Sequence, residues 1–313
     1  MGLQVYDKID TMYKRYIFDG KVCPKKEWLK FKNKIILGEF SNKTAEYLFH
    51  CPWEAYSKID GTNSKIAFFP SVAEFRVEGK TEKANSQMGQ FEYLNAIGER
   101  IKPQLAEMFP KETARFAPVN DKETNKPQYY AVDTTFIPGG GGSVPSFDKT
   151  TVENGGLYGI QLAEVPIYIY GEYFGKGIQK CGGRYIKDAQ DFLVFDIKQQ
   201  GWWLPRENRE AICKDLGLKT VPYLGIMTLA EIEKMVRAGF TTRFEGASDP
   251  TLLEEGIVAR PTIPLFDSRG NRVIVKVKYC DYIEYDAVRK EFSDEEFAEF
   301  DKWYHENVEN FKF

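Results

Sequence analysis

The sequence of 313 residues has few cysteines and no long hydrophobic segment. Its five cysteines are odd in number, scattered along the chain and form no C-x-x-C pair, which argues against a disulfide framework and a cysteine zinc site. No apolar run approaches the roughly 18–20 residues of a membrane span, and the first residues do not resemble a signal peptide. We therefore expect an intracellular, cytoplasmic protein without a membrane partner, in the host cytoplasm if a phage encodes it.

The sequence also lacks the overall positive charge that is typical of many nucleic-acid binding proteins, since its net charge is −3. Charge is unevenly distributed, however. Residues 1–34 contain nine Lys or Arg against four Asp or Glu, whereas residues 281–313 contain four against eleven. The basic segment could contact phosphates or could be a solvated charged surface. The acidic segment is a poor candidate for binding a polyanion.

Hydrophobic residues make up 42% of the chain and aromatic residues 15%, which is enough for a substantial core. Capping motifs, helix-initiating proline and residue spacing predict four helices. They begin after Pro205, Thr228 and Ser293, and the fourth covers residues 87–109 with an interruption near Pro103. One helix is thus expected in the first half of the chain and three in the second half.

Runs of β-branched and aromatic residues predict strands between and after these helices. The runs cover residues 66–69, 165–174, 192–197, 256–260 and 272–279. Residues 111–157 are instead rich in Pro, Thr, Asn and Lys, and Gly139–Gly142 are consecutive. We interpret this stretch as a long insertion that is flexible around the glycines. The whole pattern predicts an α+β fold in which helices pack against antiparallel sheets.

Lys58 is a candidate nucleophile in the segment SKIDGTN, where a predicted strand ends before a tight turn at Asp60 and Gly61. A lysine attacks an electrophile only when its amine is neutral, and neighbouring cations with partial burial favour that form. On this motif alone, an exposed lysine beside a turn is the simpler interpretation.

Lys276 and Lys278 lie two residues apart in VIVKVK, so both ammonium groups point to one face of a predicted strand. Their repulsion would be relieved by an anion such as a nucleotide α-phosphate, although a solvated strand face has the same pattern. Glu255 opens the preceding strand, and turn residues up to Asn271 predict a hairpin. The hairpin would bring the carboxylate into one pocket with the two lysines.

Glu172 ends the very apolar strand VPIYIY, where a carboxylate is unfavourable unless it lies at an edge or has a partner. A nucleotide hydroxyl or a metal-bound water would be such a partner, and an exposed strand-end acid is the alternative. Phe195 comes near the end of FLVFDI. It could stack on a purine, although an aromatic residue in such a run more often belongs to the core.

In this order, the segments KIDGTN, GEYFGKGIQK, FLVFDI, EGIVARP and VKVK resemble the motifs of the covalent nucleotidyltransferase superfamily. That superfamily includes ATP-dependent DNA and RNA ligases and messenger-RNA capping enzymes, and the chain is most similar to its RNA ligase 2-like branch. The resemblance implies a nucleotidyltransferase (ATP-grasp-like ligase) domain over residues 45–282, with the insertion at about 111–157. Residues 1–44 would form a basic N-terminal segment and residues 283–313 an acidic C-terminal helix.

The resemblance implies that Lys58 forms a lysyl–AMP phosphoramidate with ATP. Glu255 would bind or position the divalent metal, Mg²⁺ or Mn²⁺. Lys276 and Lys278 would neutralise the α-phosphate and the pyrophosphate that leaves. AMP would then pass to a 5′-phosphate end, and a 3′-hydroxyl would attack that end and release AMP.

The nucleotide-binding residues are also implied by the resemblance. Asn63 and Lys80 would lie near the phosphates, Glu172 would contact the ribose and serve as a second metal ligand, and Phe195 would stack on adenine. Two positions depart from the family pattern, because Ser57 replaces a glutamate before the nucleophile and Lys80 replaces an arginine. Lysine offers a point charge where the planar arginine fork binds phosphate through two hydrogen bonds.

Only 35 residues follow Lys278, too few for the OB domain that comes after this motif in DNA ligases and capping enzymes. We therefore expect an ATP-dependent RNA ligase that acts on RNA ends or on a nicked RNA or RNA/DNA duplex. Its substrate contacts would come from the core, the basic segment, the insertion or a protein partner. A DNA ligase, a GTP-using capping enzyme and an inactive nucleic-acid-binding module are the alternatives.

Overall fold

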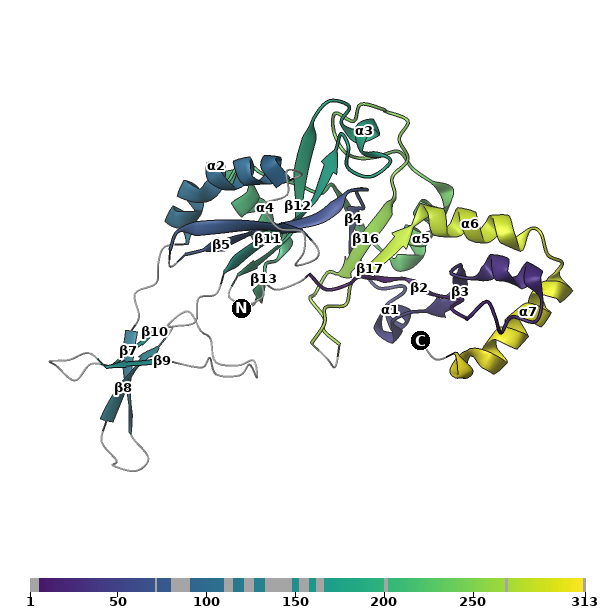
Figure 1. The fold of residues 1–313 in the computed structure, drawn as a ribbon, viewed down its shortest axis with the longest axis horizontal. Coiled ribbons are helices and arrows are strands. Elements are labelled where there is room, and N and C mark those ends of the chain that lie inside the picture. Colours follow the sequence, from purple (N-terminus) through teal and green to yellow (C-terminus); the bar gives the residue numbers. More distant parts are fainter. Residues whose placement is uncertain are drawn as a thin grey trace. The chain divides into compact units, whose positions relative to one another are not determined.

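The computed structural model describes residues 6–70, 72–79, 91–109, 166–199, 202–267 and 270–311, with the backbone of four further strands between residues 115 and 161. The chain divides into two compact units. Unit 1 comprises Met1–Asn63, Glu172–Leu193 and Thr220–Phe313, and unit 2 comprises Ser64–Gly171 and Val194–Lys219. Both units combine antiparallel strands with helices, as predicted (Figure 1).

Unit 1 contains a five-stranded sheet. Its strands, in spatial order, are β1 (Asp10–Thr11), β17 (Val275–Lys278), β16 (Gly256–Pro261), β4 (Trp53–Ser57) and β15 (Tyr223–Met227). All neighbours are antiparallel except β1 and β17, which are parallel. Strands β16 and β17 form the predicted hairpin, although β17 ends at Lys278, where helix α6 (Tyr279–Arg289) begins.

The core of unit 1 lies on one face of this sheet. Val275 and Val277 are buried while Lys276 and Lys278 remain partly exposed, because successive residues of a strand point to opposite faces. The valines pack in one cluster with residues of helix α5 (Leu229–Ala238) and of α6. Helix α5 begins at the predicted capping box of Thr228 and Glu231. A short helix, α1 (Lys43–Tyr47), contributes Ala45 to the same cluster.

The two ends of the chain share a second, aromatic core within unit 1. It is built from β2 (Tyr13–Arg15), β3 (Ile35–Phe40), the 3₁₀ helix η1 (Lys26–Phe31), α7 (Asp294–Asn307) and the short helix η3 (Val308–Asn310). Phe300 of α7 is fully buried, and its ring lies 4.4 Å from that of Phe31 and 4.8 Å from that of Tyr16. Figure 1 shows the purple N-terminal strands beside the yellow C-terminal helices. Ser293 and Glu296 form the predicted capping box of α7.

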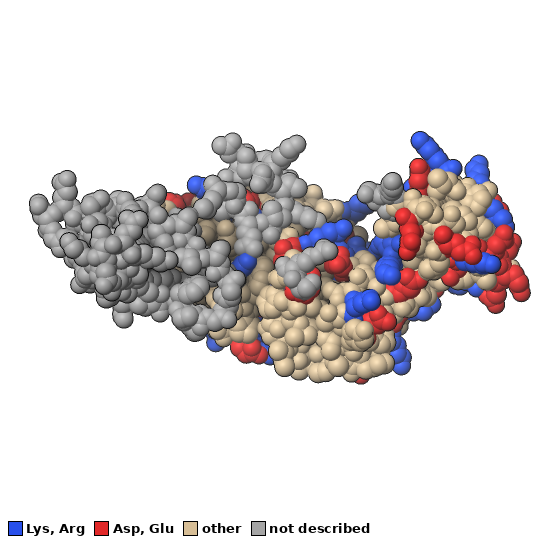
Figure 2. Space-filling model, turned by 90° about the horizontal axis from the view of Figure 1, so that it is seen from below, with Lys and Arg blue, Asp and Glu red and all other residues tan. Residues whose placement is uncertain are grey.

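Ion pairs join the same two ends. Four cations of the basic N-terminal segment contact carboxylates near the C-terminus: Arg15–Asp281 (2.6 Å), Lys25–Glu299 (2.5 Å), Lys30–Glu291 and Lys34–Glu284 (2.7 Å). Figure 2 shows the resulting mixture of blue and red side chains on this part of unit 1. The three lysine pairs are at least partly exposed and contribute little stability each. All four pairs together compensate four of the nine positive charges of residues 1–34.

Unit 2 is organised around the central part of a second sheet. Its strands follow the order β13 (Trp202–Trp203), β12 (Gln190–Gln199), β11 (Ile167–Gly175), β5 (Thr62–Phe69) and β6 (Glu74–Gly79), and β14 (Lys219–Thr220) also pairs with β12. Strands β5, β11 and β12 each have one end in unit 1. Arg209 of helix α4 (Arg206–Asp215) is completely buried and donates a hydrogen bond to the carbonyl of Phe195.

Helix α2 (Glu92–Met108) corrects one prediction, because it continues through Pro103 without interruption. A proline removes one intrahelical hydrogen bond and crowds the preceding turn. Here Ile101 and Leu105, on either side of Pro103, are fully buried. The free energy gained by burying these side chains in the helix offsets the cost of the proline. Residues 87–90 of the predicted helix lie outside the described residues.

The predicted insertion contains three short strands and is followed by a fourth. They are β7 (Arg115–Asn120), β8 (Pro127–Val132), β9 (Asp148–Thr151) and β10 (Tyr158–Gln161). They form two antiparallel pairs, β7 with β8 and β9 with β10. Gly139–Gly142, which we predict to be flexible, lie outside the described residues. Within the described parts of the chain, no helix has both the length and the apolar composition needed to cross a membrane.

Candidate active site

Lys58 lies directly after β4, an inner strand of the unit 1 sheet. Its backbone N–H donates a hydrogen bond of 3.0 Å to the carbonyl of Gly256, which continues the ladder between β4 and β16. The Lys58 side chain is 22% exposed, and its Nζ lies 2.5 Å from Oε2 of Glu255. The nucleophile candidate is thus fixed through both its backbone and its amine.

Glu255 connects Lys58 to the β16–β17 hairpin. Its other carboxylate oxygen, Oε1, lies 2.6 Å from Nζ of Lys278, which is opposite Gly256 in the hairpin. Burial by itself would lower the pKa of Lys278, but the hydrogen bond and the charge of Glu255 outweigh it and raise that pKa. One carboxylate is therefore shared by two ammonium groups, which leaves this group of three with a net positive charge that favours an anion.

Gly256 allows the close contact between the two strands of the hairpin. A Cβ atom at this position would lie 2.0 Å from the carbonyl oxygen of Val277 and 2.9 Å from the Cα of Lys278. No side chain fits there without separating β16 from β17. The glycine after Glu255 is therefore needed to bring this carboxylate to Lys278.

Lys276 differs from Lys278, although the two share one face of β17. Its Nζ donates a hydrogen bond of 2.7 Å to the carbonyl of Ile9, in the segment that leads into β1. The structure thus brings Lys278 to Glu255 and turns Lys276 toward the N-terminal segment.

Glu172 lies in strand β11, against the loop that follows Lys58. A Cβ atom on Gly61 would come within 2.9 Å of Cγ of Glu172 and 2.5 Å of the carbonyl of Tyr173, so only glycine permits this approach. Burial raises the pKa of Glu172 to about 8. The charges of Glu255 and Asp60 add to this rise, while Lys58 and the N–H of Gly61 oppose it. Glu172 is thus largely protonated at neutral pH in the free protein.

Asp60 is a further member of the site that the sequence did not reveal. Burial and the charge of Glu255 raise its pKa, and Lys58 and Lys278 oppose this rise. Its backbone N–H points to the hydroxyl of Tyr185 at 3.4 Å, in helix α3 (Gly182–Tyr185). In the sequence, an aspartate before a glycine is explained by the turn alone.

Glu254 was also missed, and it lies beneath the site. It is 2% exposed, and burial raises its pKa. Its Oε2 accepts a hydrogen bond of 3.1 Å from the backbone N–H of Arg243. Ser57, directly before Lys58, is also 2% exposed and lies close to Glu254. The position before the nucleophile therefore faces the interior.

Besides Lys276, three predicted residues are not shown in contact with this group. Asn63 is partly buried in β5 and makes no side-chain hydrogen bond with another described residue. Phe195 belongs to unit 2, in β12, and its contact with a nucleobase stays a prediction. Lys80 lies outside the described residues.

The site contains no ready-made metal centre, since no three His, Cys, Asp or Glu side chains of the described residues are placed to bind an ion. Its carboxylates are nevertheless suited to a hard cation. The pKa values of Asp60 and Glu172 are raised by burial and by neighbouring carboxylates, and a divalent ion would relieve that repulsion. Mg²⁺ commonly binds through one or two carboxylates together with phosphates and water, which fits this arrangement.

The chain is similar to known proteins in sequence and in fold. The family model of RNA ligase matches residues 52–278. Similar solved structures include the Naegleria gruberi RNA ligase with PPi, which is 16% identical with a TM-score of 0.44 over 78% of this chain and 54% of that chain. A mutant of that ligase with ATP and Mn is 15% identical, with a TM-score of 0.43 and the same coverage. No curated protein matches the sequence. The chain spans about half the length of these solved ligases.

Proposed function

Because this chain belongs to the RNA ligase family, as the match over residues 52–278 shows, we propose that it is an ATP-dependent RNA ligase in which Lys58 carries AMP. The observation that supports this role most directly is the carboxylate of Glu255, which contacts Lys58 at 2.5 Å and Lys278 at 2.6 Å. It holds the nucleophile beside a second cation, where the negatively charged phosphate of a nucleotide would be attracted.

In the first step, the ammonium group of Lys58 releases a proton to solvent, and the neutral Nζ attacks the α-phosphorus of ATP. A nitrogen–phosphorus bond forms as the nitrogen gives up one more proton, the bond to the β-phosphate oxygen breaks, and pyrophosphate leaves. Lys278, which contacts Glu255, would offset the charge on the phosphate together with Lys276 on the same face of β17. Glu172, whose pKa burial raises to about 8, can donate a hydrogen bond to a ribose hydroxyl while it keeps its proton and can accept one once a cation has displaced that proton. In such a reaction the protein mainly positions groups and compensates charge.

In the later steps, a 5′-phosphate oxygen displaces Lys58 from the adenylate phosphorus, and a 3′-hydroxyl then displaces AMP from the activated end. We propose RNA ends or a nicked RNA or RNA/DNA duplex as substrates. A divalent ion, Mg²⁺ or Mn²⁺, held by Glu172, Glu255 and the phosphates would neutralise charge on the phosphates. Asn63, Lys80 and Phe195 keep their proposed contacts with the phosphates and the adenine.

The test of this proposal is intact-mass spectrometry after incubation with ATP and Mg²⁺. We expect the wild-type protein to gain the mass of one adenylyl group and Lys58→Ala to gain none. Lys32→Ala, which removes an exposed lysine elsewhere in unit 1, is the control and should react as the wild type. An adduct on Lys58→Ala, an adduct with GTP only, or no adduct on the wild type would overturn the proposal.

A second experiment tests the choice of polymer. Nicked duplexes that carry either RNA or DNA at the 3′-hydroxyl side would be offered to the adenylylated enzyme. Sealing should require RNA at the terminal nucleotides, because the 2′-hydroxyl is the group that distinguishes the two polymers. Equal sealing of both nicks would show that the enzyme does not select RNA.

A further inference from the structure

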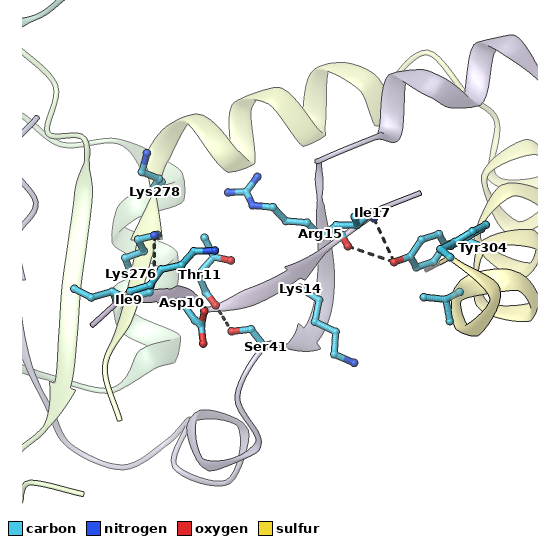
Figure 3. Close-up of a pocket in the computed structure, with 13 residues that line it drawn as sticks. Ile9, Asp10, Thr11, Lys14, Arg15, Ile17, Ser41, Lys276, Lys278 and Tyr304 are labelled. Atoms are coloured by element: carbon cyan, nitrogen blue, oxygen red, sulfur yellow. Dashed lines mark hydrogen bonds between the residues drawn. The ribbon is translucent and has the colours of Figure 1, made fainter. Parts of the chain in front are cut away.

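A pocket of about 580 Å³ lies in unit 1 beside the face of β17 that carries Lys276 and Lys278. Strands β1 and β2 and the residues around and after α7 form its other walls (Figure 3). Of the thirteen residues that line it, only Lys276 and Lys278 lie inside residues 52–278. The pocket is thus formed mainly by the two ends of the chain, outside the part that the RNA ligase family model matches.

The lining of the pocket is strongly basic at one end. Five cations line the pocket together with one carboxylate, that of Asp10. Two of the cations also pair outside the lining, Arg15 with Asp281 and Lys278 with Glu255. The five cations are Lys8, Lys14, Arg15, Lys276 and Lys278. Lys14 is 57% exposed and lies 3.3 Å from Glu39, a pair that solvent weakens. Lys8 is exposed and has no ion pair within the described residues. These ammonium groups provide the electrostatic attraction that phosphate groups require.

The other end of the pocket is apolar. Ile17 is 43% exposed, and Val308 and Phe311 line the same region. Figure 3 shows the hydroxyl of Tyr304 bonded to the backbone of Arg15 and Ile17. Tyr304 thus ties the C-terminal wall to the N-terminal wall. A phosphate-attracting end beside an apolar end fits a nucleotide, which has a charged phosphate and a flat base.

We propose that this pocket binds one nucleotide of the RNA strand, with a backbone phosphate at Lys8 and Lys14 and the base against Ile17 and Phe311. This inference rests on the proposed ligase function and names where the polymer is held. Lys278 lines the pocket and also contacts Glu255, the partner of Lys58. A strand bound there would therefore lie next to the residues that transfer AMP.

The test measures binding of a 5′-phosphorylated RNA oligonucleotide to Lys8→Glu. We expect about tenfold weaker binding, the scale of one lost hydrogen bond to a charged group. The plot of log K against log[salt] should be less steep by about 0.7, because one phosphate contact of a single strand is lost. Lys32→Glu makes the same change of charge on an exposed residue outside the pocket. If Lys32→Glu weakens RNA binding as much as Lys8→Glu does, the proposed binding site is wrong.

The apolar end is tested by Ile17→Ala against Ile283→Ala, which removes an isoleucine of similar exposure, 46%, outside the pocket. Only Ile17→Ala should weaken RNA binding. Lys58 adenylylation should proceed normally in Lys8→Glu and Ile17→Ala, which separates this proposal from the ligase function itself. If Lys8→Glu loses adenylylation and keeps RNA binding, the pocket serves the phosphates of ATP and the strand-binding proposal is wrong.

Discussion

At the scale of single residues, the candidate site depends on the balance between lysines and carboxylates. Two ammonium groups share the carboxylate of Glu255, and the charge of Glu255 helps to raise the pKa values of both Asp60 and Glu172. Carboxyl groups with raised pKa values are frequent in active sites, because partial burial and neighbouring like charges are combined there. The free protein thus holds a proton at Glu172 that a cation would displace.

The first prediction concerns the pH dependence of stability at Glu172. Its pKa is 4.5 in an unperturbed chain and about 8 in the folded protein. The folded state therefore binds more protons than the unfolded state between these values, and stability must fall as pH rises through this window. Glu172→Gln should remove this part of the loss, on the order of 1–3 kcal/mol between pH 5 and 8.

Thermal unfolding of the wild type and the variant at pH 5 and pH 8 provides the measurement. The side-chain amide introduced by Glu172→Gln would still accept the hydrogen bond from the N–H of Gly61, so the contact itself is kept. Glu99→Gln, an exposed position on α2, is the control and should leave the pH dependence unchanged. Parallel curves for wild type and Glu172→Gln would show that the carboxyl is not buried as the structure indicates.

Residues that combine a motif with a chemical role could be identified from the sequence, and others could not. Lys58, Glu255 and Lys278 were named because each lies in an ordered motif, and the structure brings these three together. Asp60 was assigned to a turn, a sufficient explanation for an aspartate before glycine. Glu254 and Glu255 are adjacent and identical, and only the direction of each side chain in the fold decides which one is buried.

At the scale of elements, the β16–β17 hairpin determines the geometry of the site. Its existence could be predicted, because alternating residues and a turn sequence are local signals. Its tight spacing could not, since the contact of Gly256 with the carbonyl of Val277 depends on the exact register. The continuous helix α2 illustrates the same limit, because the burial that stabilises it around Pro103 arises from tertiary packing.

The second prediction is that Gly256→Ala disrupts this hairpin. The new methyl group would lie 2.0 Å from the carbonyl oxygen of Val277, so β16 and β17 would have to separate. We expect a loss of about 2 kcal/mol or more in stability and a loss of adenylylation that persists at temperatures where the variant is folded. Gly183→Ala is the matched control, because a Cβ atom at Gly183 meets no atom within 4 Å. Normal adenylylation by folded Gly256→Ala would contradict the role given to the hairpin.

At the scale of the whole chain, the main feature that sequence reasoning did not foresee is the association of its two ends within unit 1. Residues 1–44 and 283–313 were treated as separate segments, distinguished by their opposite charge. In the structure their charges pair and their aromatic residues form one core. Contacts between residues almost 300 positions apart leave no periodic signal in the sequence. The complementary charges of the two ends were the one available indication.

The last prediction tests whether this shared core organises both ends. Phe300 is fully buried and stacks on Phe31, and its ring centre lies 5.7 Å from that of Trp28. Phe300→Ala should therefore destabilise the aromatic core by about 3–5 kcal/mol. Both segments should then become sensitive to brief trypsin digestion. Lys58 adenylylation should remain, because strands β4, β16 and β17, which position the site, pack in a different core cluster. RNA binding should fall as well, since both ends line the pocket. Phe266→Ala removes an exposed ring and serves as the control, which should show none of these effects. If Phe300→Ala resists trypsin as well as the wild type does, the two ends are held together by other contacts.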